Sequence, residues 1–252
     1  MERSVSSECP EPGTGTRVLP ATGTNDETVA EYVLGAVLAM LRNGAYHATA
    51  SVLAGEWPRT RLLAGRDAKG LTLGLVGFGA IARQVATRAQ AFGMRVLATD
   101  PFVAPGDPSW GALGVERREL APLLPEANVL SIHVPMTPET RGMIDAAALA
   151  RLPAGACVVN TARGGIIDEE ALVAALKSGH LAGATIDVFE SEPLAAASRF
   201  VGAPNLILSP HIAGITSDAN LRASLLTADN VRLVLEGKPP RVADAAAGAR
   251  QP

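Results

Sequence analysis

The sequence predicts an α/β fold, in which a parallel sheet is covered by helices on both faces. From Leu71 onward, short apolar runs alternate with amphipathic stretches, as strands and crossover helices do in such folds. The apolar residues are mainly Ala, Leu and Val, and aromatic residues make up only 4% of the chain. Aliphatic residues of this kind fill strands that are buried on both faces. The 252 residues are enough to bury a substantial core.

The first regular element expected is an almost wholly apolar helix over Val29–Leu41, which Asp26 or Thr28 could cap. Its apolar residues at helical spacing are Val33, Leu34, Val37, Leu38 and Leu41. Because apolar residues occupy almost every side, we expect this helix to be buried. Residues 1–26 are rich in Ser, Thr, Gly, Pro and acidic residues, and only Arg17–Leu19 suggests a short strand there.

Strands and helices are then expected in alternation. The predicted strands are Leu71–Val76, Arg95–Ala98, Val129–His133, Cys157–Asn160, Ala184–Val188 and Leu206–Leu208. The predicted helices between them are Ala80–Ala91, Arg118–Leu124, Ala146–Leu152 and Glu169–Lys177. A last helix over Ser217–Leu235 should end before Gly237 and the two prolines that follow, and an Ala-rich tail covers Ala243–Arg250.

Composition argues against several classes of partner and leaves a small metabolite as the expected one. The formal charge is −3 and no run of Lys or Arg occurs, so neither nucleic acid nor a membrane surface is expected to bind. No apolar stretch approaches the roughly 18 residues of a membrane span, and residues 1–16 lack the apolar centre of a signal peptide. Cys9 and Cys157 suggest no disulfide framework. The expected location is the cytoplasm, and no metal site is predicted.

A glycine-rich turn follows the first predicted strand and opens the next helix. Gly77 would permit the tight turn, Gly79 would let a pyrophosphate approach the backbone, and the small Ala82 would allow the helix to pack closely on the strand. Glycine turns also serve chain geometry alone, so this pattern is weak by itself. Asp100, however, ends the second strand about 20 residues later, where a carboxylate accepts hydrogen bonds from ribose hydroxyls and repels a 2′-phosphate. Together they predict a Rossmann-type doubly wound sheet that binds NAD rather than NADP.

Four later segments resemble the signature blocks of the D-2-hydroxyacid dehydrogenases in order and spacing. They are Ser131–Arg141, Val158–Asp168, Gly183–Pro193 and Ser209–Gly214. The resemblance extends from about Val29 to Ala243. It implies hydride transfer between NAD and a 2-hydroxy or 2-keto acid, with Arg163, Glu192 and His211 as the catalytic residues.

Each of these residue types suits its implied task. The planar, permanently charged guanidinium of Arg163 can hold a carboxylate, and the imidazole of His211 can give or take a proton near neutral pH. Glu192 would bind the other ring nitrogen and orient the ring. Read singly, Arg163 could cap backbone carbonyls, Glu192 could be a solvated loop charge, and His211 could be a structural histidine. All three follow predicted strands, at the sheet edge where parallel folds bind ligands.

The resemblance also implies a set of cofactor contacts. Ala80 and Ile81 would approach the pyrophosphate together with Gly77 and Gly79, with Asp100 on the ribose. Val134 and Pro135, next to His133, would lie near the adenosine. Thr161, Ala162, Arg163, Asp187 and His211 would surround the nicotinamide end, and Gly214 would leave room for its ring. Asp187 would accept from the carboxamide, although it could instead cap the loop that follows it.

Three regions are expected along the chain. Residues 1–26 are interpreted as a mobile leader with a substrate-domain remnant, residues 27–216 as the NAD-binding domain, and residues 217–252 as a returning helix and tail. Family members normally begin with a flavodoxin-like substrate domain of about 100 residues, of which only Thr16–Asn25 resembles a remnant. The apolar residues of the last helix that would meet that domain are Leu221, Leu225, Val231 and Leu235, which are expected to be exposed, disordered or covered by another subunit.

Several functions therefore remain open. The chain could be a dehydrogenase, with low activity if the substrate domain is truncated. It could be an NAD(H) sensor that binds other proteins, like the corepressors that resemble this family, or an inactive gene remnant. A homodimer through the NAD-binding domain is expected, with the helix from Val29 and the segment through Trp57 contributing to the interface.

Overall fold

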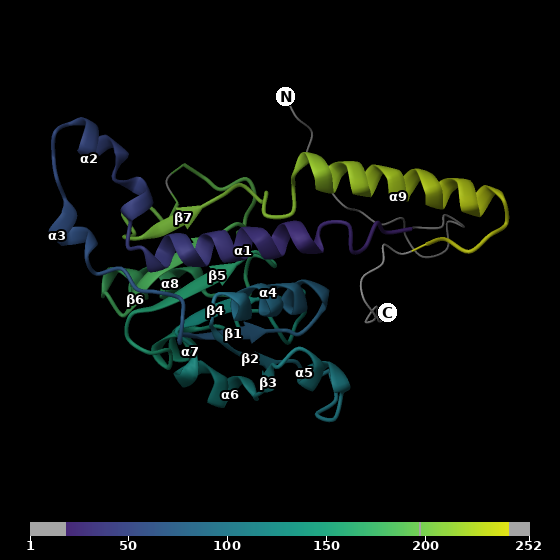
Figure 1. Ribbon diagram of the computed structural model, residues 1–252, viewed down its shortest axis with the longest axis horizontal. Helices are drawn as coiled ribbons and strands as arrows, with labels where there is room; N and C mark the ends of the chain where they lie inside the picture. Colours follow the sequence, from purple (N-terminus) through teal and green to yellow (C-terminus); the bar gives the residue numbers. More distant parts are fainter. Residues whose placement is uncertain (1–18, 197, 242–252) are drawn as a thin grey trace. The chain divides into compact units, whose positions relative to one another are not determined.

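The computed structural model describes residues 19–196 and 198–241, which divide into two compact units (Figure 1). The larger unit comprises residues 26–215. The smaller one combines the described residues that precede position 26 with those that follow position 215. The possible strand at Arg17–Leu19 falls mostly outside the described residues, and Leu19 itself belongs to no strand. The Ala-rich tail also lies outside them.

Within the described part of the chain, a seven-stranded parallel sheet forms the centre of the larger unit. Its strands are β1 (Thr72–Val76), β2 (Arg95–Thr99), β3 (Glu116–Arg117), β4 (Val129–Ile132), β5 (Ala156–Asn160), β6 (Leu181–Ile186) and β7 (Leu206–Leu208). Their order is β3-β2-β1-β4-β5-β6-β7. The chain therefore winds outward from β1 to one edge and returns to wind outward from β4 to the other. This confirms the predicted doubly wound sheet, with its switch point between β1 and β4, where such folds bind ligands.

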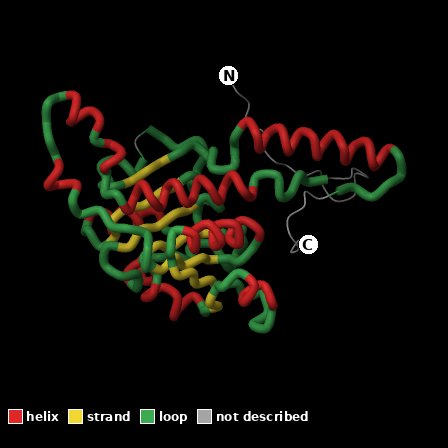
Figure 2. Tube along the Cα trace, in the orientation of Figure 1, coloured by secondary structure: helices red, strands yellow, loops and turns green. Residues whose placement is uncertain are grey.

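Helices cover both faces of this sheet (Figure 2). Helices α1 (Asp26–Leu41) and α4 (Ala80–Ala91) pack on one face, and α6 (Leu120–Leu123), α7 (Ala146–Ala150) and α8 (Glu169–Lys177) pack on the other. The shorter helical segments are η1 (Ala45–His47), α2 (Thr49–Leu53), α3 (Arg59–Leu62), α5 (Pro108–Ala112) and η2 (Leu124–Glu126).

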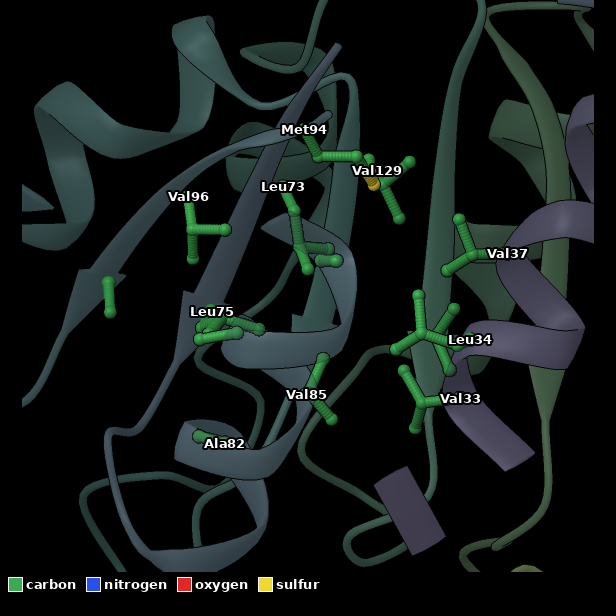
Figure 3. Packing of buried hydrophobic residues seen from close by; sticks show 14 of the residues in the cluster. Val33, Leu34, Val37, Leu73, Leu75, Ala82, Val85, Met94, Val96 and Val129 are labelled. Atoms are coloured by element: carbon green, nitrogen blue, oxygen red, sulfur yellow. The ribbon is translucent and has the colours of Figure 1, made fainter. Parts of the chain in front are cut away.

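The strands divide their side chains between two cores. Figure 3 shows the first, in which α1 and α4 share a cluster with β1 and β2. Its labelled members are Val33, Leu34, Val37, Leu73, Leu75, Ala82, Val85, Met94, Val96 and Val129. On the opposite face, Gly74 lets helix α6 lie directly on β1, because a Cβ there would meet Leu123 Cδ2 at 2.7 Å and Ala127 Cβ at 2.9 Å. Both faces of the sheet are thus buried against helices, as the aliphatic composition predicted.

The differences from the predicted elements have local causes. Helix α1 begins at Asp26, so Asp26 and Thr28 lie inside its first turn and the predicted caps are wrong. The helix predicted over Arg118–Leu124 is reduced to α6, and the chain continues as a 3₁₀ turn at Pro125. Strand β3 has only two residues, both charged, and carried no apolar signal.

The smaller unit contains α9 (Ser217–Leu235), with the predicted bounds. Thr216 caps this helix by accepting from Ala219 N at 3.0 Å, and Arg222 Nε donates to Thr24 O at 2.9 Å. The apolar side chains predicted to lack cover are exposed: Leu221, Leu225, Val231 and Leu235. Among the described residues, no helix combines the length and hydropathy that a bilayer span needs.

Candidate active site

The predicted site residues gather in the loops that follow the carboxyl ends of β1, β2, β4, β5, β6 and β7. Parallel strands present these loops at one edge of the sheet. The arrangement therefore brings together residues from positions 77 to 214 on one side of the larger unit.

The turn after β1 contains two glycines, and the absence of a side chain serves a different purpose at each. Gly77 has φ 98°, and a Cβ there would lie 2.5 Å from His133 O and 3.0 Å from Val134 Cγ1. Gly79 has φ −74°, is exposed, and would place a Cβ with no atom of the described residues within 4 Å. Gly77 is thus required by the fold, while the space beside Gly79 is free for a ligand.

Helix α4 begins directly after Gly79, at Ala80 and Ile81, and no side chain caps its amino terminus. Uncapped amides and the positive end of the helix dipole favour an anion at this place. The turn therefore fits a pyrophosphate, as predicted.

Asp100, which directly follows β2, is held in a fixed orientation by the backbone. Its Oδ2 accepts from Phe78 N at 2.9 Å and its Oδ1 accepts from Phe102 N at 2.8 Å. The carboxylate is half-buried, so part of it remains accessible. Each carboxylate oxygen can accept a further hydrogen bond. This geometry suits the predicted contact with the ribose hydroxyls.

Arg163 lies in a turn that Asn160 organises. Asn160, the last residue of β5, is 2% exposed; its Nδ2 donates to Arg163 O at 2.9 Å and its Oδ1 accepts from Ala162 N at 3.0 Å. Sequence reasoning did not assign this residue, although a polar side chain ending a buried strand is a usable signal. The Arg163 side chain is exposed, and its Nη1 donates a hydrogen bond to Ala162 O at 2.6 Å.

Gly164 joins the Arg163 turn to the loop that carries Glu192. A Cβ at Gly164 would fall 1.9 Å from Phe189 O and 2.5 Å from Glu190 N, so the two backbones are in direct contact. The two loops are therefore close enough for the charge of Arg163 to help lower the pKa of Glu192.

Thr161 is a buried hydroxyl that lacks a hydrogen bond. Its Oγ1 has no partner among the residues that the structure describes. Buried polar atoms are normally satisfied, and Thr161 with half-buried Ala162 was predicted to lie near the nicotinamide. A polar group of a bound cofactor would supply the missing partner.

His211 and Glu192 form the predicted pair. His211 Nδ1 lies 2.8 Å from Glu192 Oε2, and Glu192 Oε1 accepts from Phe189 N at 2.9 Å. No described residue hydrogen-bonds Nε2 of His211, whose side chain is half exposed. Burial acts to raise the pKa of Glu192, but hydrogen bonds from His211 and Phe189 and the charges of His211 and Arg163 bring it below its usual value. The pair can therefore hold a proton at Nε2 over a carboxylate that stays ionised.

Asp187 is fully buried and holds the loop that contains His211. Its Oδ1 accepts from Ile212 N at 2.9 Å, its Oδ2 accepts from Ala213 N at 2.8 Å, and its backbone oxygen accepts from His211 N at 2.8 Å. The loop-capping alternative is thus seen in the structure, while the contact with the carboxamide stays a prediction. Gly214 follows in the same loop and is half-buried.

The residues after β4 complete the edge. His133 Nε2 lies 2.9 Å from Ser131 Oγ, and desolvation lowers the pKa of His133 to about 4. This histidine is therefore neutral at ordinary pH and unsuited to donate a proton there. Val134 lies against Gly77, and Pro135 is exposed beside it.

Comparison with known proteins agrees with this geometry. Residues 34–213 match the NAD-binding domain of the family described as D-isomer specific 2-hydroxyacid dehydrogenases. The chain is 55% identical over 219 residues to an (S)-sulfolactate dehydrogenase of Chromohalobacter salexigens, covering 86% of this chain and 70% of that protein. It is 41% identical to a D-3-phosphoglycerate dehydrogenase of Mycobacterium leprae, covering 89% of this chain and 42% of the relative. The crystal structure of the TT0316 protein of Thermus thermophilus aligns with a TM-score of 0.81 at 38% identity, covering 90% of this chain and 71% of that one.

Proposed function

Because this chain belongs to the D-isomer specific 2-hydroxyacid dehydrogenases and carries their NAD-binding domain, we propose that it catalyses hydride transfer between NAD and a 2-hydroxy acid. The family, the Rossmann-type fold and the cofactor predicted from the sequence are confirmed by the family match and the structural similarity. The assignment of single residues is our proposal. The observation that carries it is the His211–Glu192 pair, 2.8 Å apart, with Nε2 of the histidine facing no described partner.

Each catalytic side chain has a separate task in the proposed reaction. When bound, the cofactor would supply a hydride as NADH or accept one as NAD⁺. Arg163 binds the substrate carboxylate, because its exposed guanidinium offers two parallel N–H donors. His211 gives a proton from Nε2 to the carbonyl oxygen during reduction and takes it back from the hydroxyl during oxidation. Glu192 holds Nδ1 and stabilises the protonated ring.

For the substrate, we propose a 2-hydroxy acid with a second anionic group. The support is the 55% identity to a protein named (S)-sulfolactate dehydrogenase. Sulfolactate and its keto acid are therefore the first pair to assay, beside pyruvate, glyoxylate and hydroxypyruvate as simpler acids.

The first test is titration of the chain with NADH, followed by nicotinamide fluorescence, with NADPH as the matched ligand. We expect saturable binding that favours NADH. Asp100→Ala should weaken it by about tenfold or more, because the ribose loses a charged acceptor. NADH oxidation with each keto acid then tests catalysis, using His211→Asn as the inactive control.

Two results would contradict the proposal. Equal affinity for NADPH would remove the role of Asp100. Normal NADH binding without turnover of any acid would favour the alternative of an NAD(H)-binding interaction protein.

The assembly and location belong to the same proposal. We propose a homodimer that uses the segment between α1 and β1, because its helices α2 and α3 bury none of their residues within the described chain. Large apolar side chains in this segment are exposed: Tyr46, Val52, Leu53, Trp57 and Leu63. The apolar face of α1 itself packs on the sheet and is not free for a partner. A cytoplasmic location fits a reaction that uses a nicotinamide cofactor and a chain whose Cys157 is a free buried thiol.

A further inference from the structure

Helix α1 reaches the loop that carries His211 through two hydroxyl groups. Tyr32, on α1, places its phenolic oxygen 2.5 Å from Ser209 Oγ, and Ser209 Oγ donates to Asp187 Oδ1 at 2.5 Å. Ser209 lies two residues before His211, directly after β7. A series of hydrogen bonds thus links Tyr32 and Ser209, which are 177 positions apart in the sequence, to the buried carboxylate of Asp187 that holds the His211 loop.

The direction of this chain follows from counting hydrogens. A serine hydroxyl has one hydrogen, and the carboxylate of Asp187 can only accept. Because Ser209 donates its hydrogen to Asp187, the phenol of Tyr32 must donate to Ser209 Oγ. The Tyr32–Ser209–Asp187 chain therefore has one polarity, and removing the phenol leaves the serine oxygen without its donor.

Asp187 extends this series of hydrogen bonds to the backbone around His211. The Oδ1 that accepts from Ser209 also accepts from Ile212 N, and Oδ2 accepts from Ala213 N. His211 has φ 57°, a backbone region that non-glycine residues seldom adopt. A conformation of this kind persists only when its surroundings fix it, and the amides on the carboxyl side of His211 are fixed by Asp187.

Tyr32 lies on a helix that is packed in the core. Its near neighbours on α1 include Ala30 and Val33, both at 0% exposure in the cluster against the sheet. A side chain anchored on a packed helix holds its partner more firmly than one on a loop.

We propose that Tyr32 and Ser209 are positioning residues, which fix the His211 loop through Asp187 and so set the orientation of the catalytic imidazole. The proposal rests on the proposed function, in which His211 exchanges the proton. Neither residue touches the reacting atoms.

The experiment compares Ser209→Ala, Ser209→Thr, Tyr32→Phe and the double variant Tyr32→Phe/Ser209→Ala in the full chain. One control variant removes a hydroxyl elsewhere: Ser178→Ala deletes a hydroxyl that donates to Ala175 O at 3.0 Å. The readouts are kcat and KM for the keto acid, and amide hydrogen exchange of Ile212 and Ala213 measured by NMR without ligands.

We expect Ser209→Ala to speed exchange at Ile212 and Ala213 roughly tenfold and to lower kcat by a similar factor, as loss of a hydrogen bond to a charged group does. KM should change by less than about threefold, because Arg163 is untouched. Ser209→Thr keeps the donor and should restore kcat. Tyr32→Phe should have a smaller effect, and it should have none in the Ser209→Ala background, because its action passes through Ser209.

Unchanged exchange at both amides in Ser209→Ala would overturn the proposal, and so would additive effects of Tyr32→Phe and Ser209→Ala. A change of equal size in Ser178→Ala would show a general loss of rigidity and would also count against it. The exchange measurement needs no turnover. A chain without dehydrogenase activity would therefore refute the proposed function, while the exchange data would still decide whether the hydroxyl groups hold the loop.

Discussion

At the scale of single residues, buried polar side chains fix the loops that carry the exposed side chains proposed as catalytic. Asn160 binds both ends of the turn that contains Arg163, and Asp187 binds three backbone groups around His211. Arg163 and the His211–Glu192 pair are themselves exposed or half exposed. The proposed catalytic groups can thus meet solvent and a substrate, while hydrogen bonds from buried side chains fix their backbone.

The pH dependence of the reaction belongs to this scale. The folded chain lowers the pKa of Glu192, so the carboxylate contributes stability above its unfolded pKa, and this contribution is lost as the pH falls through the lowered value. Glu192 is therefore ionised at neutral pH. Keto acid reduction should slow as the pH rises, because the proposed step consumes a proton that His211 must carry.

Glu192→Gln should move this alkaline decline to lower pH and reduce kcat by about tenfold to a hundredfold, because the imidazolium loses its anionic partner. The measurement is the pH–rate profile of NADH oxidation. Glu190→Gln, at an exposed neighbouring carboxylate, is the control. A reduction rate that does not change with pH in the unaltered chain would exclude His211 as the acid.

Sequence reasoning could identify residues with a chemical task more easily than residues with a supporting one. Arg163, Glu192 and His211 follow strands and resemble a family pattern, so they were predicted. Asn160 binds the turn that directly follows it, and a polar side chain at the end of a buried strand was a usable signal for it. Ser209 and Tyr32 act through partners that are distant in the sequence, and Tyr32 is 177 positions from Ser209. The roles of these two residues depend on packing geometry, which no local pattern encodes.

At the scale of elements, the turn after β1 contains one glycine that the fold requires, Gly77, and one that leaves space for a ligand, Gly79. Gly77→Ala forces a side chain into a positive-φ position against His133 O, and we expect it to cost roughly 1–3 kcal/mol of stability. Gly79→Ala has a normal φ and open space, and we expect an unchanged unfolding midpoint with about tenfold weaker NADH binding.

Thermal unfolding and NADH titration of both variants test this contrast. Gly111→Ala, at a helical glycine of α5 with no described atom near its Cβ position, is the control. Full NADH affinity in Gly79→Ala would mean that the pyrophosphate does not approach this turn.

The long elements could be predicted because their apolar periodicity is strong. Helices α4, α8 and α9 have the predicted bounds. The short elements β3 and α5 were missed for different reasons. Strand β3 exists only by pairing with β2, and α5 depends on the cap in which Asp107 Oδ1 accepts from Ser109 N at 2.8 Å. The dipeptide Asp107–Pro108 was a usable signal for that helix.

At the scale of the whole molecule, the segment between α1 and β1 is the proposed dimer interface. Leu53 is 83% exposed and Trp57 is 78% exposed. Sedimentation of the chain at micromolar concentration should show a dimer, and Leu53→Asp with Trp57→Ser should shift it to a monomer, because charge and polarity disfavour a buried interface.

Val201→Ser is the control for this experiment, since Val201 is a 67% exposed apolar residue outside the segment. A dimer that survives the double change at Leu53 and Trp57 would place the interface elsewhere, and a chain that is monomeric throughout would remove the dimer from the proposal.

The position of α1 also affects how the chain is made. Helix α1 is synthesised before β5 and β6, the strands on which it packs, and these follow more than a hundred residues later. At ribosomal rates of about 5–20 residues per second, its apolar surface lacks these partners for on the order of ten seconds. We expect chaperones to bind helix α1 during this interval. Because its contacts have high sequence separation, completion of the sheet should be the slow step of folding.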